Sequence, residues 1–221
     1  MRERYICYDN VTIGANKQIE PYAIIGQIGK NGNDRECLVI GDNVYIGSRV
    51  TICKGVTIGN NVELRDGVFI ARKNLIGNNC RFGPKTVIEY GNKIGDRVRI
   101  HSHSFVERVI IESDVFIGPH VVFTDDIHPA CPRYEECSCE THIESYVSIG
   151  ANVTIVPGIR IGTHSQIFAG AVVTKDVEAF SVIAGNPAKK IKDIKDLKCH
   201  KGFFERPFMW WGDHERYKEK K

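Results

Sequence analysis

The sequence contains no apolar run approaching the roughly 18–20 residues that cross a bilayer, so we expect no membrane partner. Its first four residues lead into no apolar stretch of the signal-peptide type, which favours a cytoplasmic location over export. One sign of charge does not dominate: 30 basic and 27 acidic residues are largely interspersed, which indicates no nucleic-acid partner. The chain is instead rich in evenly spread glycine, with 21 residues, and 42% of it is hydrophobic, which excludes intrinsic disorder.

An aliphatic residue or phenylalanine recurs at every sixth position through most of the chain. Steps of six from Ile40 reach Val106; the phase then slips by one residue, continues to Phe123, and resumes from Ile143 to Val173. Glycine often follows this position, which suits a tight corner, and the fifth position is often valine. The period predicts short parallel strands wound into a coil, with coils about 4.8 Å apart. A β-sandwich, the alternative, would give turn signals every ~8–12 residues.

Three of these six-residue units read Ile40-Gly-Asp-Asn-Val-Tyr45, Ile58-Gly-Asn-Asn-Val-Glu63 and Ile149-Gly-Ala-Asn-Val-Thr154. They resemble the hexapeptide repeats of left-handed parallel β-helix acyltransferases, over about residues 11–192. The resemblance implies an all-β fold, a left-handed parallel β-helix with three hexads per coil. It also implies a homotrimer with active sites between subunits.

The repeat is interrupted by two insertions, at residues 26–38 and 124–142. Solenoids place such insertions on one face, which is often the binding face. We expect a β-helix domain over residues 1–180 and a C-terminal cap with an aromatic tail over residues 181–221. Apolar residues at 191, 194 and 197 predict a short amphipathic helix across the open end of the coil.

The second insertion begins Phe123-Thr-Asp-Asp-Ile-His-Pro129. In galactoside- and maltose-type O-acetyltransferases a His-Pro pair stands at the same distance after such a hexad, and its histidine is the general base. The resemblance implies this role for His128, with Asp125 or Asp126 as an orienting group or substrate ligand. A neutral imidazole accepts a proton near pH 7; alternatively, His128 only caps the loop. The Phe-Thr-Asp-Asp run also resembles nucleotide-sugar amino N-acetyltransferases, where the substrate amine can attack directly.

Four further basic residues are placed by counting along the repeat. His103 and His120 take the fourth position of units one coil apart, so they are predicted to stack on one outer face. Lys85 continues this column one coil earlier, and His101 lies at the neighbouring corner. Such a basic column beside the 124–142 insertion could receive a nucleotide diphosphate or sugar substrate, or it could be a solvated surface.

The last units contain Ala169-Gly-Ala-Val-Val-Thr-Lys-Asp-Val177 and Ala184-Gly-Asn-Pro-Ala-Lys189. These motifs resemble the coenzyme A end of hexapeptide acetyltransferases and imply acetyl-CoA as co-substrate. Carried over by position, the contacts are Ala151 and Ala169 with pantetheine, Thr174 and Lys175 with the pyrophosphate, and Lys189 and Lys192 with the adenosine 3′-phosphate. Small residues admit a linear pantetheine to the backbone, and lysines supply charge for phosphate.

Eight cysteines without a signal peptide favour reduced thiols over a disulfide framework. Cys131 and Cys137 in the second insertion, with Cys199 in the tail, could bind a structural zinc that joins the two segments. Free thiols are the alternative, because the spacing is not a standard zinc pattern. γ-Class carbonic anhydrases share the expected fold, but the histidines here do not reproduce the spacing of their metal ligands.

The sequence therefore predicts an acetyl-CoA-dependent acetyltransferase that N-acetylates a nucleotide-linked amino sugar. The alternative is O-acetylation of a sugar or other small hydroxyl acceptor, with His128 as the base. A non-catalytic β-helix scaffold is a third reading, against which the intact cofactor end argues.

Overall fold

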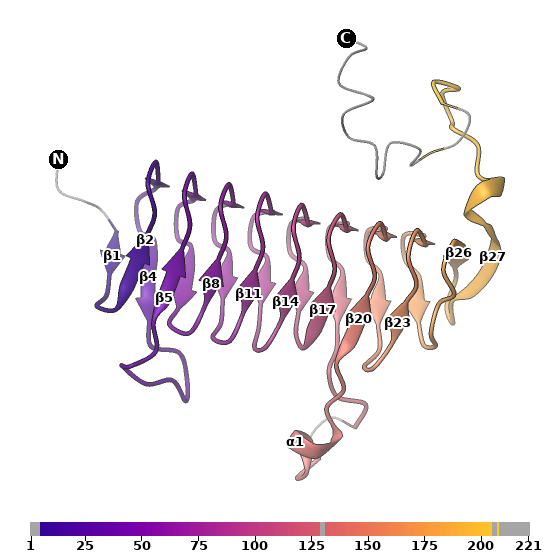
Figure 1. Cartoon of the computed structure of the whole chain (residues 1–221). Helices are drawn as coiled ribbons and strands as arrows, with labels where there is room; N and C mark the ends of the chain where they lie inside the picture. Colours follow the sequence, from indigo (N-terminus) through magenta and orange to yellow (C-terminus); the bar gives the residue numbers. More distant parts are fainter. Residues whose placement is uncertain (1–4, 129–130, 205–206, 208–221) are drawn as a thin grey trace.

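A computed structural model describes residues 5–128, 131–204 and 207, and these form a prism of stacked coils with three parallel sheets as its faces (Figure 1). The first sheet contains β1 (Ile6–Cys7), β4 (Ile24–Gln27), β7 (Thr51–Cys53), β10 (Phe69–Ile70), β13 (Val87–Ile88), β16 (Phe105–Val106), β19 (Val122–Phe123), β22 (Thr154–Ile155) and β25 (Val172–Val173). The second sheet contains β2 (Val11–Ile13), β5 (Leu38–Ile40), β8 (Thr57–Ile58), β11 (Leu75–Ile76), β14 (Lys93–Ile94), β17 (Val109–Ile111), β20 (Thr141–Ile143) and β23 (Arg160–Ile161). The third sheet contains β3 (Gln18–Ile19), β6 (Tyr45–Ile46), β9 (Glu63–Leu64), β12 (Arg81–Phe82), β15 (Arg99–Ile100), β18 (Phe116–Ile117), β21 (Ser148–Ile149), β24 (Gln166–Ile167), β26 (Ser181–Ala184) and β27 (Lys189–Asp193).

Each coil crosses the first, second and third sheets in turn. We call the bend after the first sheet the first corner, the bend after the second sheet the second corner, and the bend after the third sheet the third corner. Ile70 pairs in register with Ile52 on one side and Ile88 on the other, and all three side chains are fully buried. The six-residue period thus winds the chain into a parallel β-helix with one continuous apolar column, as predicted, and the fold is the left-handed one that the family resemblance implies.

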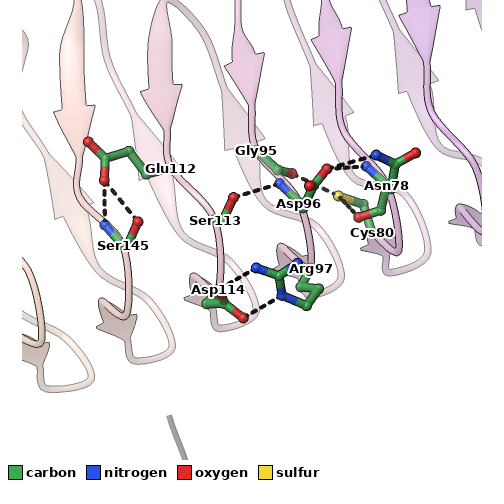
Figure 2. Close-up of polar contacts among 9 residues, drawn as sticks. All are labelled: Asn78, Cys80, Gly95, Asp96, Arg97, Glu112, Ser113, Asp114 and Ser145. Atoms are coloured by element: carbon green, nitrogen blue, oxygen red, sulfur yellow. Dashed lines mark hydrogen bonds and ion pairs between the residues drawn. The ribbon is translucent and has the colours of Figure 1, made fainter. Parts of the chain in front are cut away.

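Polar side chains of one coil hold the backbone of the preceding coil at the second corner (Figure 2). The Oδ1 atom of Asp96 accepts the amide N–H of Asn78 at 2.6 Å, and the amide of Asp96 donates to Ser113 Oγ at 3.0 Å. Arg97 and Asp114 form a two-pronged ion pair with both N···O distances 2.7 Å. The first two contacts satisfy backbone donors that the two-residue strands leave unpaired, and the ion pair links adjacent coils through side chains alone.

The glycine that follows many strands is required by this close stacking. A Cβ atom on Gly77 would lie 2.5 Å from Asp96 Oδ1 and 2.7 Å from the carbonyl carbon of Gly95. Two non-bonded heavy atoms do not approach so closely, so a larger residue would force adjacent coils apart. This explains why Gly and then Asp or Asn follow the buried isoleucine in the repeat.

The one-residue slip in the repeat lies at the first corner, where two buried asparagines stack inside the prism. Asn74 Nδ2 donates to the carbonyl of Glu89 at 2.8 Å, and Asn92 Nδ2 donates to Asn74 Oδ1 at 2.9 Å. Asn92 Oδ1 accepts the amide of Val109 at 2.9 Å, the first strand residue after the shortened corner. The corner between β16 and β17 is one residue shorter than in the regular repeat, and the side-chain amides inside it supply hydrogen bonds to the backbone there.

The C-terminal end is closed by strands and not by the predicted helix. β26 continues the third sheet, and β27 pairs antiparallel with it, so Ile191 lies in a strand. The expected short helix is limited to one 3₁₀ turn, Ile194–Asp196. Backbone pairing with the unpaired edge of β26 outweighs the helical spacing of three apolar residues.

Two further expectations concern this end and the membrane. In the aromatic tail, Phe203 is 80% exposed, while Phe208, Trp210 and Trp211 lie outside the described residues. Among the residues that the structure describes, no helix has the length and apolar character needed to cross a membrane.

Candidate functional site

Both insertions leave the prism at the first corner (Figure 1). Residues 28–37 join β4 to β5, and residues 124–140, which contain the short helix α1 (Tyr134–Cys137), join β19 to β20. Because both connections run from the first sheet to the second, they project from one edge, several coils apart. This placement follows the general expectation that solenoid insertions gather on one face.

The second insertion is anchored to the prism through Asp125, whose side chain is buried. The hydroxyl of Tyr134 donates to Asp125 Oδ2, and Arg108 Nε lies 3.7 Å from the same oxygen. The amide of Cys139 donates to the Asp125 carbonyl at 3.0 Å. Burial and the bond to Asp125 raise the pKa of Tyr134 to about 12, so it remains a hydrogen-bond donor. These contacts make Asp125 the group that holds the insertion against the coil.

His128 lies at an exposed position of the same insertion. Its backbone amide donates to Asp126 Oδ1 at 2.7 Å, and its carbonyl accepts the amide of Cys131 at 3.1 Å. Asp126 therefore shapes the turn that presents His128, through the backbone and not through the imidazole. An imidazole held on a fixed turn and open to solvent can accept a proton from a bound acceptor. Pro129, which completes the His-Pro motif, lies outside the described residues.

A carboxylic acid that the motifs did not single out lies beside this anchor. Burial raises the pKa of Glu107 to about 7, and the charges of Asp125 and Glu89 act in the same direction while Arg108 opposes them. Burial also raises the pKa of Glu89. Glu107 lies in the corner where the six-residue phase slips, and that slip is the only signal in the sequence that marks it. A carboxyl group with such a pKa exchanges protons at neutral pH.

The predicted histidine column is present at the third corner. The rings of His103 and His120 stack with centroids 5.0 Å apart and an interplanar angle of 9°. Lys85 has the same left-handed backbone conformation one coil earlier, and the His101 ring packs on Phe116 at 5.0 Å. The expected position of this column directly beside the 124–142 insertion is wrong within one chain. His120 lies at the third corner, before β19, and the insertion leaves the first corner, after β19. The length of a first-sheet strand therefore separates the histidine column from the insertion.

A shallow basic pocket adjoins the histidine column. Its lining consists of Arg65, Arg81, Gly83, Pro84, Arg99, Ile100, His101 and Ser102. Glu63 pairs with Arg65 at 2.9 Å and with Arg81 at 2.8 Å, and thereby neutralises part of the charge. Within the described part of the chain Arg99 has no ion-pair partner. The pocket therefore carries positive charge that an anionic ligand could neutralise.

The predicted cofactor residues lie at the C-terminal end of the prism, on two corners. Ala151 and Ala169 follow one another at the third corner, where Cβ atoms on Gly118 and Gly150 would lie 2.8 and 2.6 Å from their backbone nitrogens. Thr174 and Lys175 lie at the first corner, directly after β25. The first sheet separates the two pairs, so a ligand that contacts both would have to cross the outer face of β22 and β25.

The cap brings two more of these lysines to the same end. Ala188 donates its amide to the Val172 carbonyl at 2.8 Å, so Lys189 begins β27 beside the last coil. Lys190 pairs with Glu178 and Asp193, whereas the structure gives Lys189 and Lys192 no ion pair among the described residues. Their ammonium groups, and that of Lys175, are exposed and available to phosphate.

The predicted zinc site is not formed. Cys131 and Cys137 have their sulfur atoms 3.8 Å apart, but no cluster of three metal-binding side chains occurs in residues 5–128, 131–204 and 207. The reason is the chain topology. The insertion leaves the first corner between β19 and β20, in the middle of the prism, whereas the cap lies at the C-terminal end of the prism and Cys199 follows it in sequence (Figure 1).

Comparison with known proteins agrees with the fold and the repeat. Residues 38–72 match the bacterial transferase hexapeptide family, and residues 141–175 match the hexapeptide repeat of succinyl-transferase. The galactoside O-acetyltransferase of Lactococcus lactis is 35% identical over 98 residues, which cover 40% of this chain and 47% of that protein. The 2,3,4,5-tetrahydropyridine-2,6-dicarboxylate N-acetyltransferase of Ligilactobacillus salivarius is 47% identical over 55 residues, covering 25% of this chain and 24% of that protein.

Among solved structures, the polySia specific acetyltransferase NeuO aligns with a TM-score of 0.52 and 26% identity, over 86% of this chain and 85% of NeuO. The fold and the repeat define a left-handed parallel β-helix built from hexapeptide repeats of the kind found in bacterial transferases. In its repeat and its fold the chain is similar to hexapeptide-repeat acyltransferases. It spans half or less of the length of the curated relatives that it matches.

Proposed function

We propose that this protein transfers an acetyl group from acetyl-CoA to a sugar that carries negative charge, of which a nucleotide-linked amino sugar is the favoured example. The observation that carries the proposal is the C-terminal end of the prism. There, tightly stacked coils expose Ala151 and Ala169, and Lys175, Lys189 and Lys192 remain unpaired by acidic residues of the described chain. Small residues suit a linear pantetheine arm, and exposed lysines suit the pyrophosphate and 3′-phosphate.

The acceptor would enter through the basic pocket and the histidine column. Arg99 supplies positive charge at this corner, which a diphosphate or carboxylate neutralises, and the neighbouring rings of His101, His103 and His120 offer hydrogen-bonding nitrogens. This charge is the reason to prefer an anionic sugar over a neutral one. The specificity that the name of NeuO states, for polySia, is in keeping with an acidic glycan as acceptor.

The transfer itself needs a group that removes a proton from the acceptor. The neutral imidazole of His128 accepts the proton from the acceptor as its oxygen or nitrogen attacks the thioester carbonyl. The carbon–sulfur bond then breaks, and the imidazolium returns the proton to the departing thiolate. An amino acceptor attacks without this base if it is already neutral, so the effect of removing His128 separates the two acceptor classes.

The O-acetyltransferase alternative is favoured by one observation, the 35% identity to the Lactococcus galactoside enzyme. A panel of nucleotide-linked amino sugars and their hydroxyl counterparts, with release of free CoA thiol as the readout, distinguishes the two. We expect His128→Ala to lower kcat about 100-fold or more with a hydroxyl acceptor. His142→Gln, on the outer face of the second sheet, is the matched control. If no acceptor of either class supports release of the CoA thiol, sugar acetylation is refuted.

The donor site is tested separately. We expect Lys192→Ala to raise the KM for acetyl-CoA about tenfold while kcat changes little, because the lysine binds a part of the donor that does not react. The same variant should show a much smaller effect with acetyl-dephospho-CoA, which lacks the 3′-phosphate. Lys93→Ala, an exposed lysine on β14, is the control. Equal effects with both donors would contradict the assignment.

We also propose that the protein works as a homotrimer. In a single chain the first sheet separates His128 from the histidine column, so one chain does not bring base and acceptor site together at one corner. A second copy could place its third corner against the first corner of its neighbour. Light scattering of the purified protein tests the trimer. Mixed trimers of His128→Ala and Arg99→Ala chains should regain activity if the site is shared.

A further inference from the structure

Two of the cysteines form a close pair in the insertion that carries His128. Cys131 and Cys137 lie on either side of Tyr134, and their sulfur atoms are 3.8 Å apart. A disulfide has a sulfur–sulfur distance of about 2.05 Å, so less than 2 Å of approach separates the thiols from a bond. Both are half-buried, and the segment between them has no pairing to the sheets that would oppose a small movement.

The surroundings of the two sulfur atoms differ. The amide of Arg133 donates to Cys131 Sγ at 3.4 Å, and such a donor stabilises a thiolate. The two sulfur atoms lie within hydrogen-bonding distance of each other, and this contact raises the pKa of Cys137 and so disfavours its thiolate. Cys131 is thus the attacking sulfur of the pair, and Cys137 is the one that resolves.

The other thiols lack this arrangement. Burial raises the pKa of Cys80 to about 11, and its sulfur donates to the Gly95 carbonyl at 3.1 Å. Cys7 and Cys37 are exposed, and the sulfur of each donates to a backbone carbonyl of its own segment, at 3.8 Å in both cases. Cys139 is the nearest competitor, since its sulfur contacts the Cys137 carbonyl at 3.4 Å.

We propose that Cys131 and Cys137 are a redox-active dithiol that closes to a disulfide by exchange with a low-molecular-weight disulfide such as oxidised glutathione. The Cys131 thiolate attacks one sulfur of oxidised glutathione, and one glutathione leaves as its thiolate. Cys137 then loses its proton and attacks the Cys131 sulfur, and the second glutathione leaves. The protein gives up two electrons and two protons, and the oxidised glutathione is reduced to two glutathione molecules.

The bond would stiffen the insertion because the cysteines lie between its anchors. The Cys131 amide donates to the His128 carbonyl, and Tyr134, inside the ring that the disulfide closes, bonds to Asp125. A bridge from residue 131 to residue 137 therefore fixes the turn of His128 relative to the buried aspartate. This effect is on the geometry of the insertion and does not depend on the acceptor or on acetyl transfer.

The experiment is a redox titration of the full chain in mixtures of reduced and oxidised glutathione, followed by intact mass and peptide mapping. We expect the wild type to lose the mass of two hydrogen atoms and to yield a Cys131–Cys137 peptide. Cys137→Ser should stop at a glutathione adduct on Cys131, at a yield at least about tenfold above that in the wild type. Cys139→Ser is the matched control and should still form the bridge.

Hydrogen exchange of residues 124–140 tests the consequence, and we expect it to slow in the oxidised wild type and not in oxidised Cys137→Ser. Equal adduct yields on Cys131 in the wild type and in Cys137→Ser would overturn the proposal, because Cys137 would then not resolve the adduct. A bridge that maps to Cys139 would also overturn it. Unchanged exchange in the bridged protein would overturn the stiffening of the insertion.

Discussion

Replacing Glu107 by glutamine tests whether the raised pKa of this carboxyl group lowers the stability of the protein at neutral pH. Glu107 is partly buried beside Asp125 and Glu89, and its pKa is raised from an ordinary 4.5 to about 7. The unfolded chain releases this proton near pH 4.5, so between that pH and 7 the unfolded state binds fewer protons than the folded state. The free energy of unfolding therefore falls as the pH rises through this interval and stays lowered above it.

The size of the effect follows from the same values. One pKa unit corresponds to about 1.4 kcal/mol, so the full difference would be about 3 kcal/mol. Because Glu107 is only partly buried, solvent screening reduces this to about 1–2 kcal/mol. Glu107→Gln removes the charge and keeps the shape, so it should be more stable than the wild type by this amount at pH 8 and nearly equal to it at pH 5.

The assay is guanidinium unfolding at a fixed protein concentration, at both pH values. Glu140→Gln, an exposed glutamate in the same insertion, is the matched control and should show little change at either pH. A Glu107→Gln protein that is less stable than the wild type at pH 8 would refute the reasoning. It would mean that attraction to Arg108 outweighs the loss of hydration and the repulsion from the neighbouring carboxylates.

Three further predictions concern the prism and its insertion. Asn74→Ala removes an amide from the interior column and leaves buried partners unsatisfied, so it should lower the free energy of unfolding by about 2–4 kcal/mol. The control, Asn61→Ala, should cost only about 1 kcal/mol, because the Asn61 amide donates to Asn79 Oδ1 at an exposed corner and the main loss is its left-handed backbone preference. Gly118→Val places a Cβ atom 2.8 Å from the Ala151 nitrogen and should lower the melting temperature by several degrees; an unchanged value would mean that the coils can separate freely. Tyr134→Phe removes the hydrogen bond to Asp125 and should speed hydrogen exchange in residues 124–140 while the exchange of the sheets stays constant.

The cap and the metal show where local patterns mislead. Apolar residues at helical spacing over 191–198 predicted a helix, but an open sheet edge was available, and residues 189–193 paired with it. Three cysteines suggested zinc, but the insertion leaves the prism between β19 and β20, whereas Cys199 follows the cap after the last coil. In both cases the deciding neighbour lies far away in sequence, where no local pattern can report it.

The candidate site also contains residues that the sequence could predict and residues that it could not. His128, the histidine stack and the lysines of the last coils could be predicted, because each occupies a countable position in the repeat or follows a motif. The roles assigned to them stay predictions. Glu107 and the anchoring of Asp125 by Tyr134 and Arg108 could not be predicted, since burial and charge there arise when an insertion folds back onto a corner.

The sequence by itself determined the architecture, because a buried aliphatic residue at every sixth position, often followed by glycine, allows few other ways to bury the apolar residues. Contacts between coils are then repeats of one local rule, so counting along the chain locates them. Tertiary structure alone decided which corner carries both insertions, which asparagines fill the interior at the slip, and which carboxyl groups lose water. These depend on distances between segments that the period does not encode, and a carboxyl group's proton affinity follows from those distances.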